Sequence, residues 1–272
     1  MSFSNFKIGE SSFQIRTTSR RFARWMNGAL SAYRVRRKAP VAFSVVIAGG
    51  EEERIRARKR FHIIYQGSRQ LLRTKDIGTL ARGLLAEIER SLLAERDDAV
   101  YVQDPAIALD GKIALVPDFY RQTLARLGRR PELAGLRLPV ERVVAVDDSG
   151  RVVPITPQLQ VPEDAVQRVI EKFGGDGAGP VARIEQPVSP DIVVGVVPDS
   201  GPEHHMQPIS RGRALYCLAS DAVNTPKVGT ERVLEALSRL VEGAGCYSYY
   251  PDASTPEYRS QMLTGLAGLL KG

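Results

Sequence analysis

The histidines and nearby carboxylates of this chain offer little that could hold a metal ion. His204 and His205 are adjacent, but neighbouring side chains in a strand point to opposite faces and would not share an ion. Glu203 and His205 could lie on one face, yet no third ligand follows at metal-site spacing, and His62 is far away in the sequence. The sequence therefore predicts no metal site.

The other reactive side chains also lack the neighbours that catalysis needs. Asp147 and Asp148 stand in DDSG between two expected strands, where a turn is the simpler interpretation. No serine stands in a G-x-S-x-G motif, and GGDGAG at 174–179 follows no strand, so a flexible linker is expected there. Cys217 and Cys246 lie in or beside apolar stretches and are expected to be small buried hydrophobic residues with free thiols. We therefore identify no catalytic residue from the sequence.

Positive charge is concentrated at the start of the chain. The net charge is +7, and residues 1–60 hold 14 Lys and Arg against 4 Glu, which gives this segment +10 and the rest −3. Such asymmetry predicts a surface for an acidic partner, either nucleic acid, phosphate groups or an acidic peptide. The alternative is a solvated, arginine-rich surface. The expected members of the basic surface are Arg20, Arg21, Arg24, Arg36, Arg37 and Lys38.

The composition indicates an ordinary globular protein. Hydrophobic residues make up 43% of the 272 residues and charged residues 25%. The longest apolar runs, such as 41–50, are far shorter than a membrane span, and the polar start at 1–10 has no apolar signal core. We expect a cytoplasmic protein without a membrane partner.

Hydrophobic periodicity predicts strands and helices in alternation. In the first third we expect a hairpin over 3–18, a helix over 19–35, strands at 41–47 and 60–66, and a helix that starts at Asp76 or Thr79. Later strands are expected at 100–102, 107–109, 112–116, 142–146, 151–155, 192–197 and 246–250, and later helices at 163–173, 210–219, 231–242 and 256–270. This order predicts an α/β or α+β layered fold.

Residues 100–128 read VYVQDPAIALDGKIALVPDFYRQTLARLG, and residues 141–162 read ERVVAVDDSGRVVPITPQLQVP. Together with PDIVVGVV and HMQPISRGRALYCLASDAVN further on, they resemble the HPr kinase family. The closest likeness is to the bacterial HPr-kinase-like proteins associated with ribosomally made, modified peptides, including those of the crocagin type. The resemblance implies a mixed sheet flanked by helices, with an N-terminal α+β region at 1–95 and a degenerate kinase-like domain at 96–272.

The chain departs from that family where the nucleotide would bind. A phosphate-binding loop needs glycines, a lysine and a hydroxyl residue, but PDFYRQTL at 117–124 has no glycine and no lysine. The matching metal-binding positions retain one acidic residue of two. We therefore expect no nucleotide cofactor and no phosphoryl transfer. The positions of this vestigial site are Pro117, Asp118, Phe119, Tyr120, Arg121, Thr123 and Glu141.

The resemblance implies a pseudokinase that binds a precursor peptide, with an acidic segment, for a modifying enzyme of the same pathway. One alternative is an enzyme with a rebuilt site that uses Arg121, Thr123 and Glu141, for peptide modification or atypical kinase chemistry. A nucleic-acid partner is not expected, because the arginines are not interleaved with exposed aromatic residues. Peptide capture would use a sheet edge, such as VAFSVVI at 41–47. The alternative is that this run is a central strand.

Overall fold

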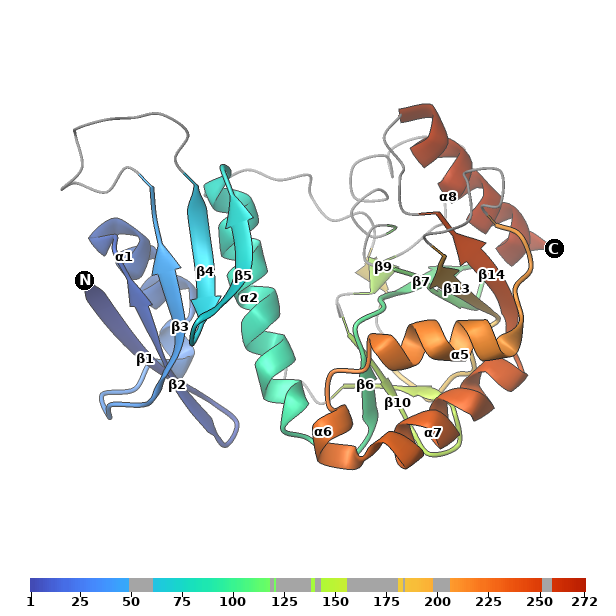
Figure 1. Cartoon of the computed structure of the whole chain (residues 1–272), viewed down its shortest axis with the longest axis horizontal. Helices are drawn as coiled ribbons and strands as arrows, with labels where there is room; N and C mark the ends of the chain where they lie inside the picture. Colours follow the sequence, from blue (N-terminus) through green and yellow to red (C-terminus); the bar gives the residue numbers. More distant parts are fainter. Residues whose placement is uncertain are drawn as a thin grey trace. The chain divides into compact units, whose positions relative to one another are not determined.

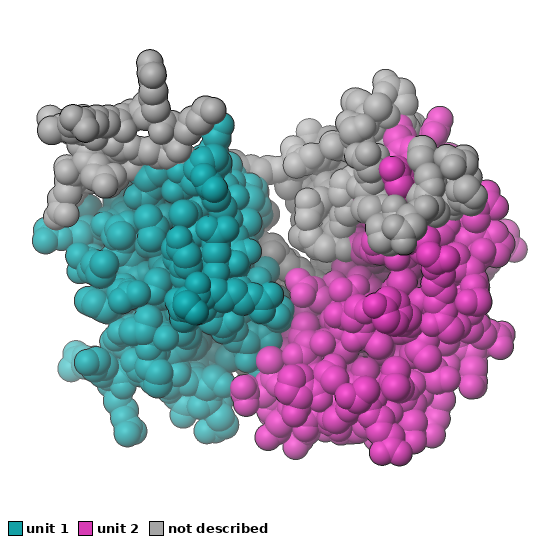
Figure 2. Space-filling view, viewed as in Figure 1, with its two compact units in different colours: residues 1–92, 156–175 teal, residues 93–155, 176–272 magenta. Residues whose placement is uncertain are grey.

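The computed structural model describes residues 1–48, 61–117, 120, 138–139, 143–155, 181–182, 184–197, 206–250 and 256–272. The chain forms two compact units, coloured separately in Figure 2. The first unit comprises residues 1–92 and 156–175, and the second comprises 93–155 and 176–272. The regions expected from the sequence were 1–95 and 96–272. Strands and helices are mixed in both units, which is an α+β fold.

A five-stranded sheet forms the first unit. Its strands are β1 (Ser2–Ile8), β2 (Ser11–Thr17), β3 (Val41–Val46), β4 (His62–Gln66) and β5 (Arg69–Thr74), and their order in the sheet is the order in the chain. β2 and β3 pair in parallel, and the other neighbours pair antiparallel. The predicted hairpin at 3–18 and the strands at 41–47 and 60–66 are confirmed.

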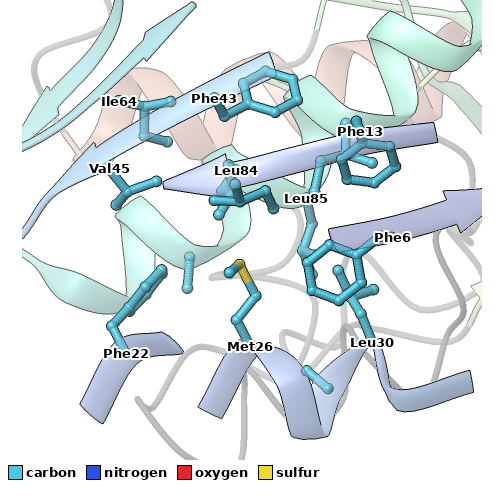
Figure 3. Close-up of a cluster of buried hydrophobic side chains, with 14 of the residues drawn as sticks. Phe6, Phe13, Phe22, Met26, Leu30, Phe43, Val45, Ile64, Leu84 and Leu85 are labelled. Atoms are coloured by element: carbon cyan, nitrogen blue, oxygen red, sulfur yellow. The ribbon is translucent and has the colours of Figure 1, made fainter. Parts of the chain in front are cut away.

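Helices α1 (Arg20–Ala29) and α2 (Ile77–Ala94) pack on one face of this sheet. Both helices contribute to a single apolar core with the inward residues of the strands, and Figure 1 shows them beside the sheet. In Figure 3, Phe22, Met26 and Leu30 point toward Phe6 and other strand residues. No described helix of the first unit covers the opposite face of the sheet.

The start and the end of α1 follow from its sequence. The Ser19 side chain accepts a hydrogen bond from the Phe22 N–H, which caps the first turn. The helix ends at Ala29, earlier than predicted, and the chain continues into a short 3-10 turn at Ser31–Tyr33. Phe22 and Met26 face the core as expected, whereas Arg20, Arg21 and Arg24 face solvent.

The second unit contains three small sheets and four described helices. One sheet has the order β14-β13-β8-β7, a second has β11-β10-β6, and the third has β12-β9. Its strands are β6 (Val100–Val102), β7 (Ala106–Leu109), β8 (Lys112–Leu115), β9 (Leu138–Pro139), β10 (Val144–Val146), β11 (Val152–Val153), β12 (Val181–Ala182), β13 (Ile192–Val196) and β14 (Gly245–Tyr249). Its described helices are α5 (Arg211–Ser220), α6 (Thr225–Val228), α7 (Thr230–Glu242) and α8 (Pro256–Lys271). The predicted helix at 163–173 lies outside the described residues.

The side chain of Asn224 fastens the start of β6. It is fully buried; its Oδ1 accepts from the Tyr101 N–H at 3.0 Å, and its Nδ2 donates to the Arg96 and Ala99 carbonyls at 3.0 and 2.7 Å. Each partner is a backbone group, so this buried side chain satisfies main-chain polar groups and stabilises the local chain path. Among the described residues, no helix is both long and apolar enough to cross a membrane.

Candidate functional site on the uncovered face of the first sheet

One row of side chains crosses all five strands on the face opposite the core. Phe6, Ile15, Val45 and Ile64 point into the core, so the residues next to them in each strand point to the other face. The strand registers align Phe3 with Arg16, Arg16 with Ser44, Ser44 with Tyr65, and Tyr65 with Gln70. This face, which no described helix covers and which is called the uncovered face below, therefore carries a continuous row of aromatic, basic and polar side chains that ends on β5.

A second row lies beside the first and adds further cations at β5. Val46 aligns with Ile63, and Ile63 aligns with Arg73. The Arg73 guanidinium carbon lies 3.8 Å from the centre of the Phe61 ring, and the Lys75 Nζ atom lies 5.7 Å from the same ring. Both distances are within the range of cation–π attraction, which holds these two cations next to the edge strand.

Most of the described cations of the first unit pair with no described carboxylate. Within residues 1–48 and 61–92, Lys7, Arg82 and Arg90 form ion pairs. The remaining cations form none in this part of the chain, so their positive charge is available to an anionic partner. They are Arg16, Arg20, Arg21, Arg24, Arg34, Arg36, Arg37, Lys38, Arg69, Arg73 and Lys75.

The strand proposed from the sequence as a sheet edge is central. β3, which contains most of VAFSVVI, pairs with β2 on one side and β4 on the other, so its backbone groups are already used. The edge at β1 is partly occupied, because the Val35 N–H donates to the Asn5 carbonyl at 3.0 Å. The edge at β5 is open: in the described part of the chain, its backbone pairs with β4 alone.

The structure separates the six basic residues predicted to form one surface. Arg20, Arg21 and Arg24 lie on the solvent side of α1, because the other side of that helix packs on the core face of the sheet. The segment 36–38 lies elsewhere. The Ala39 N–H donates to Asn5 Oδ1, and Asn5 points away from the core, so the connection from α1 to β3 crosses the uncovered face. Arg36, Arg37 and Lys38 are thus on the side of the Arg16 row.

A shallow pocket of about 190 Å³ lies on the uncovered face beside Arg16. Its lining includes Met1, Arg16, Ser44, Val46, Tyr65 and Gly67. The Arg16 Nη2 and Nε atoms donate to Ser44 Oγ at 2.8 and 3.2 Å, which fixes the guanidinium against the sheet. This pocket combines one held cation with apolar side chains.

The described part of the vestigial nucleotide loop, in the second unit, is closed and apolar. Pro117 has no N–H, and the Tyr120 N–H donates to the Pro117 carbonyl at 2.9 Å. The Tyr120 side chain is fully buried, its hydroxyl donates to the Met206 sulfur at 3.2 Å, and its ring contacts Tyr249 edge-on. Burial, together with the Tyr249 and Tyr258 phenols, raises the pKa of Tyr120 well above its ordinary value.

At these two described positions no backbone N–H is therefore directed at a phosphate site. The remaining positions of the vestigial site lie outside the described residues, so the structure does not place them: Asp118, Phe119, Arg121, Thr123 and Glu141.

The other chemical candidates have structural roles where they are described. Asp147 Oδ1 accepts from the N–H groups of Ser149 and Arg151, so DDSG is the predicted turn, and Asp148 pairs with Arg232 at 2.8 Å. Burial opposes the ionisation of Asp147, but hydrogen bonds from Ser149 and Arg151 outweigh it and lower the pKa of that carboxyl.

The two cysteines and the metal candidates give no second site. Cys217 and Cys246 are both free thiols, and burial raises the pKa of each. Residues 203–205 lie outside the described part of the chain. Within the described ranges, no group of three His, Cys, Asp or Glu side chains is arranged to hold a metal ion.

Comparison with known proteins leaves this site to be interpreted from its own geometry. No family model, curated protein or solved structure matches the chain.

Sequence reasoning did not find β5, Arg16 or Arg73. The signal for β5 was the pair Gly67-Ser68, a two-residue hairpin connection with Gly67 at φ 58°. The signal for Arg16 was its place in the alternating stretch FQIRT, where Phe13, Ile15 and Thr17 face inward and Arg16 faces outward.

Proposed function

We propose that this chain is a non-catalytic binding protein that captures an extended peptide with an acidic segment by pairing it to the edge of β5. The observation that carries the proposal is the open edge of β5 next to Arg73 and Lys75, two cations that pair with no carboxylate of the described residues. An added strand gains affinity from main-chain hydrogen bonds and specificity from side chains. Acidic side chains of the peptide would then meet the cations at this edge.

The energetics favour a peptide with several acidic residues. Arg73 and Lys75 are exposed, so each ion pair with the peptide contributes about 0.2–1 kcal/mol. Main-chain pairing supplies the rest of the affinity, and unpaired cations elsewhere on the same face speed the encounter. Affinity therefore depends on the strand conformation of the peptide and on its charge together.

The resemblance to HPr-kinase-like proteins supports the biological setting of this proposal. It suggests that the peptide is the precursor of a modified-peptide natural product and that a modifying enzyme receives it. The closed geometry at Pro117 and Tyr120 supports a role that uses no nucleotide. An enzyme with a rebuilt site would need the neighbouring loop positions to supply a phosphate cradle.

Single-stranded nucleic acid is the second candidate, because Phe3 is 54% exposed and shares a row with Arg16 and Tyr65. Two features favour a peptide. Phe3 and Tyr65 lie three strands apart, roughly 14 Å, which is too far for adjacent stacked bases. The ring of Phe61 already has Arg73 over it.

Fluorescence anisotropy with defined peptides tests the proposal. The probe is a labelled eight-residue peptide in which Glu and Val alternate, and its control has the same residues with the four Glu grouped together. We expect the alternating peptide to bind more tightly. The double charge reversal Arg73→Glu/Lys75→Glu should weaken the binding of this peptide about tenfold. The double reversal Arg20→Glu/Arg21→Glu on α1 should change its affinity little.

Three results would count against peptide capture at β5. Equal affinity for the two peptides would exclude strand pairing as the mode of binding. If neither peptide bound at about 100 μM, a peptide site at β5 would be excluded. Tighter binding of an oligothymidylate of similar length, with displacement of the peptide, would favour the nucleic-acid candidate.

A further inference from the structure

The pocket beside Arg16 is separate from the β5 edge and calls for its own ligand. Arg16 is on β2, two strands away from β4 and three away from β5. Its lining includes the outward residues Ser44 and Val46 of β3, together with Tyr65 of β4 and Met1. A peptide that pairs with β5 as one added strand does not fill this pocket.

Arg16 is held in a position suited to a carboxylate. It is partly buried, and both of its hydrogen bonds go to the neutral hydroxyl of Ser44. It forms no ion pair with any part of the described chain. A guanidinium has five N–H donors, so the donors not directed at Ser44 remain for a ligand. Two parallel N–H groups match the two oxygens of a carboxylate, and the fixed side chain loses little entropy when it binds one.

The remaining lining selects the group attached to that carboxylate. Met1 and Val46 are exposed apolar side chains at 81% and 36%, and Tyr65 lines the same pocket. The volume of about 190 Å³ is below that of sites for drug-sized ligands and suits a fragment of one residue. An apolar wall beside a held cation favours a ligand with an apolar body and one charged end.

We propose that this pocket binds a carboxylate carried on a short apolar chain. The C-terminal residue of a peptide has this chemistry when its last side chain is apolar, and so does a free short-chain fatty acid. This inference goes beyond strand capture at β5 and does not depend on it, because the pocket and the edge are formed by different strands.

Two-dimensional ¹H–¹⁵N NMR on the full chain tests the pocket. N-acetyl-leucine represents a peptide C-terminus, N-acetyl-leucinamide is the same body without charge, and hexanoate represents a fatty acid. We expect N-acetyl-leucine to bind with a Kd on the order of 1–10 mM and to shift the amides of Thr18, Ser44 and Val46. The amide should bind at least tenfold more weakly. The stronger of the two acids identifies the source of the carboxylate.

Variants separate the pocket from general charge. Arg16→Lys keeps the charge but loses the two parallel N–H donors of the guanidinium, so it should weaken the binding of N-acetyl-leucine at least fivefold. Arg73→Lys on the same face should leave that affinity unchanged. The comparison of acid with amide uses the unaltered chain and needs no variant to fold. Equal binding of acid and amide, or shifts outside the pocket alone, would overturn the proposal. If the alternating Glu and Val peptide did not bind at β5, the expected binding of N-acetyl-leucine in the pocket would be unchanged.

Discussion

Asn224→Ala is predicted to destabilise the second unit strongly. The Asn224 side chain is fully buried and makes three hydrogen bonds of 2.7–3.0 Å to the Tyr101 N–H and the Arg96 and Ala99 carbonyls. Alanine removes the side-chain partner of those three backbone groups, at about 1–3 kcal/mol for each that stays buried and unsatisfied. Some relaxation is expected, so we predict a loss of about 3–5 kcal/mol in the free energy of unfolding.

Urea denaturation followed by far-UV circular dichroism measures this loss. At an m-value of about 2 kcal/mol/M, a loss of 3–5 kcal/mol lowers the midpoint by about 1.5–2.5 M. Trp25 is the single tryptophan of the chain and belongs to α1, so its fluorescence reports the first unit at the same time. A fall in the circular dichroism midpoint should therefore exceed any change in the fluorescence midpoint.

Asn27→Ala is the matched control for this prediction. Asn27 is on α1, and its Oδ1 atom is buried without a hydrogen-bond partner in the described structure. Its removal deletes an unsatisfied polar atom and introduces a better helix former, so stability should stay the same or rise. The reasoning about Asn224 is refuted if Asn224→Ala changes the midpoint no more than Asn27→Ala does.

Three further predictions concern the basic face, the vestigial loop and the cap of α2. Arg36→Glu/Arg37→Glu should slow association of an acidic peptide and flatten its salt dependence in stopped-flow measurements, and unchanged values would make these arginines ordinary surface residues. Calorimetry should detect no Mg-ATP binding tighter than about 1 mM, or −4 kcal/mol, because Tyr120 and Pro117 present no free N–H; tighter binding would contradict this. Asp76 caps α2, and hydrogen bonds from Thr79 lower the pKa of this carboxyl. Its contribution to stability is therefore fully present above the pKa of the unfolded state and is lost as pH falls through the lower pKa of the folded state. Asp76→Ala should thus cost about 1 kcal/mol at pH 7 and less in acid, and a cost that does not depend on pH would exclude the ionised cap.

Local signals in the sequence accounted for most individual elements. The apolar spacing of Phe22, Met26 and Leu30 predicted α1, and the alternation over 3–18 with Gly9-Glu10 near its turn predicted the first hairpin. The end of α1 was placed too late, because Tyr33 continues the apolar spacing although the chain has already entered the 3-10 turn. Periodicity alone does not distinguish these two cases.

The missing strand, β5, has a physical reason for its weak pattern. Leu71 and Leu72 are adjacent and both pack against the core, which breaks the alternation expected of a strand. The register of β5 against β4 shifts here: Ile64 aligns with Leu72 and Tyr65 with Gln70, so Leu71 is the extra residue of a bulge. A bulge directs both leucines inward, and the sequence contains no local sign of it.

The candidate site itself depends on contacts between distant segments. The sequence predicted a strand at VAFSVVI but could not say whether it was an edge, because the order of strands is set by long-range pairing. The row from Phe3 to Gln70 likewise exists only through four registers. The charge excess at the start of the chain was visible, but its division between α1 and the uncovered face was not.

Binding of two N-methylated peptides tests the central claim, strand capture at β5, most directly. Both peptides have the alternating Glu and Val sequence, with N-methyl groups on every Glu in one and on every Val in the other. Alternate N–H groups of a paired strand point to its neighbour, so one peptide loses its donors toward β5 while the other loses donors toward solvent. Charge and composition are the same in both. The account predicts that one peptide binds like the unmodified probe in fluorescence anisotropy and that the other binds at least tenfold more weakly. Equal affinity of the two for the protein would contradict edge pairing and leave charge alone as the source of binding.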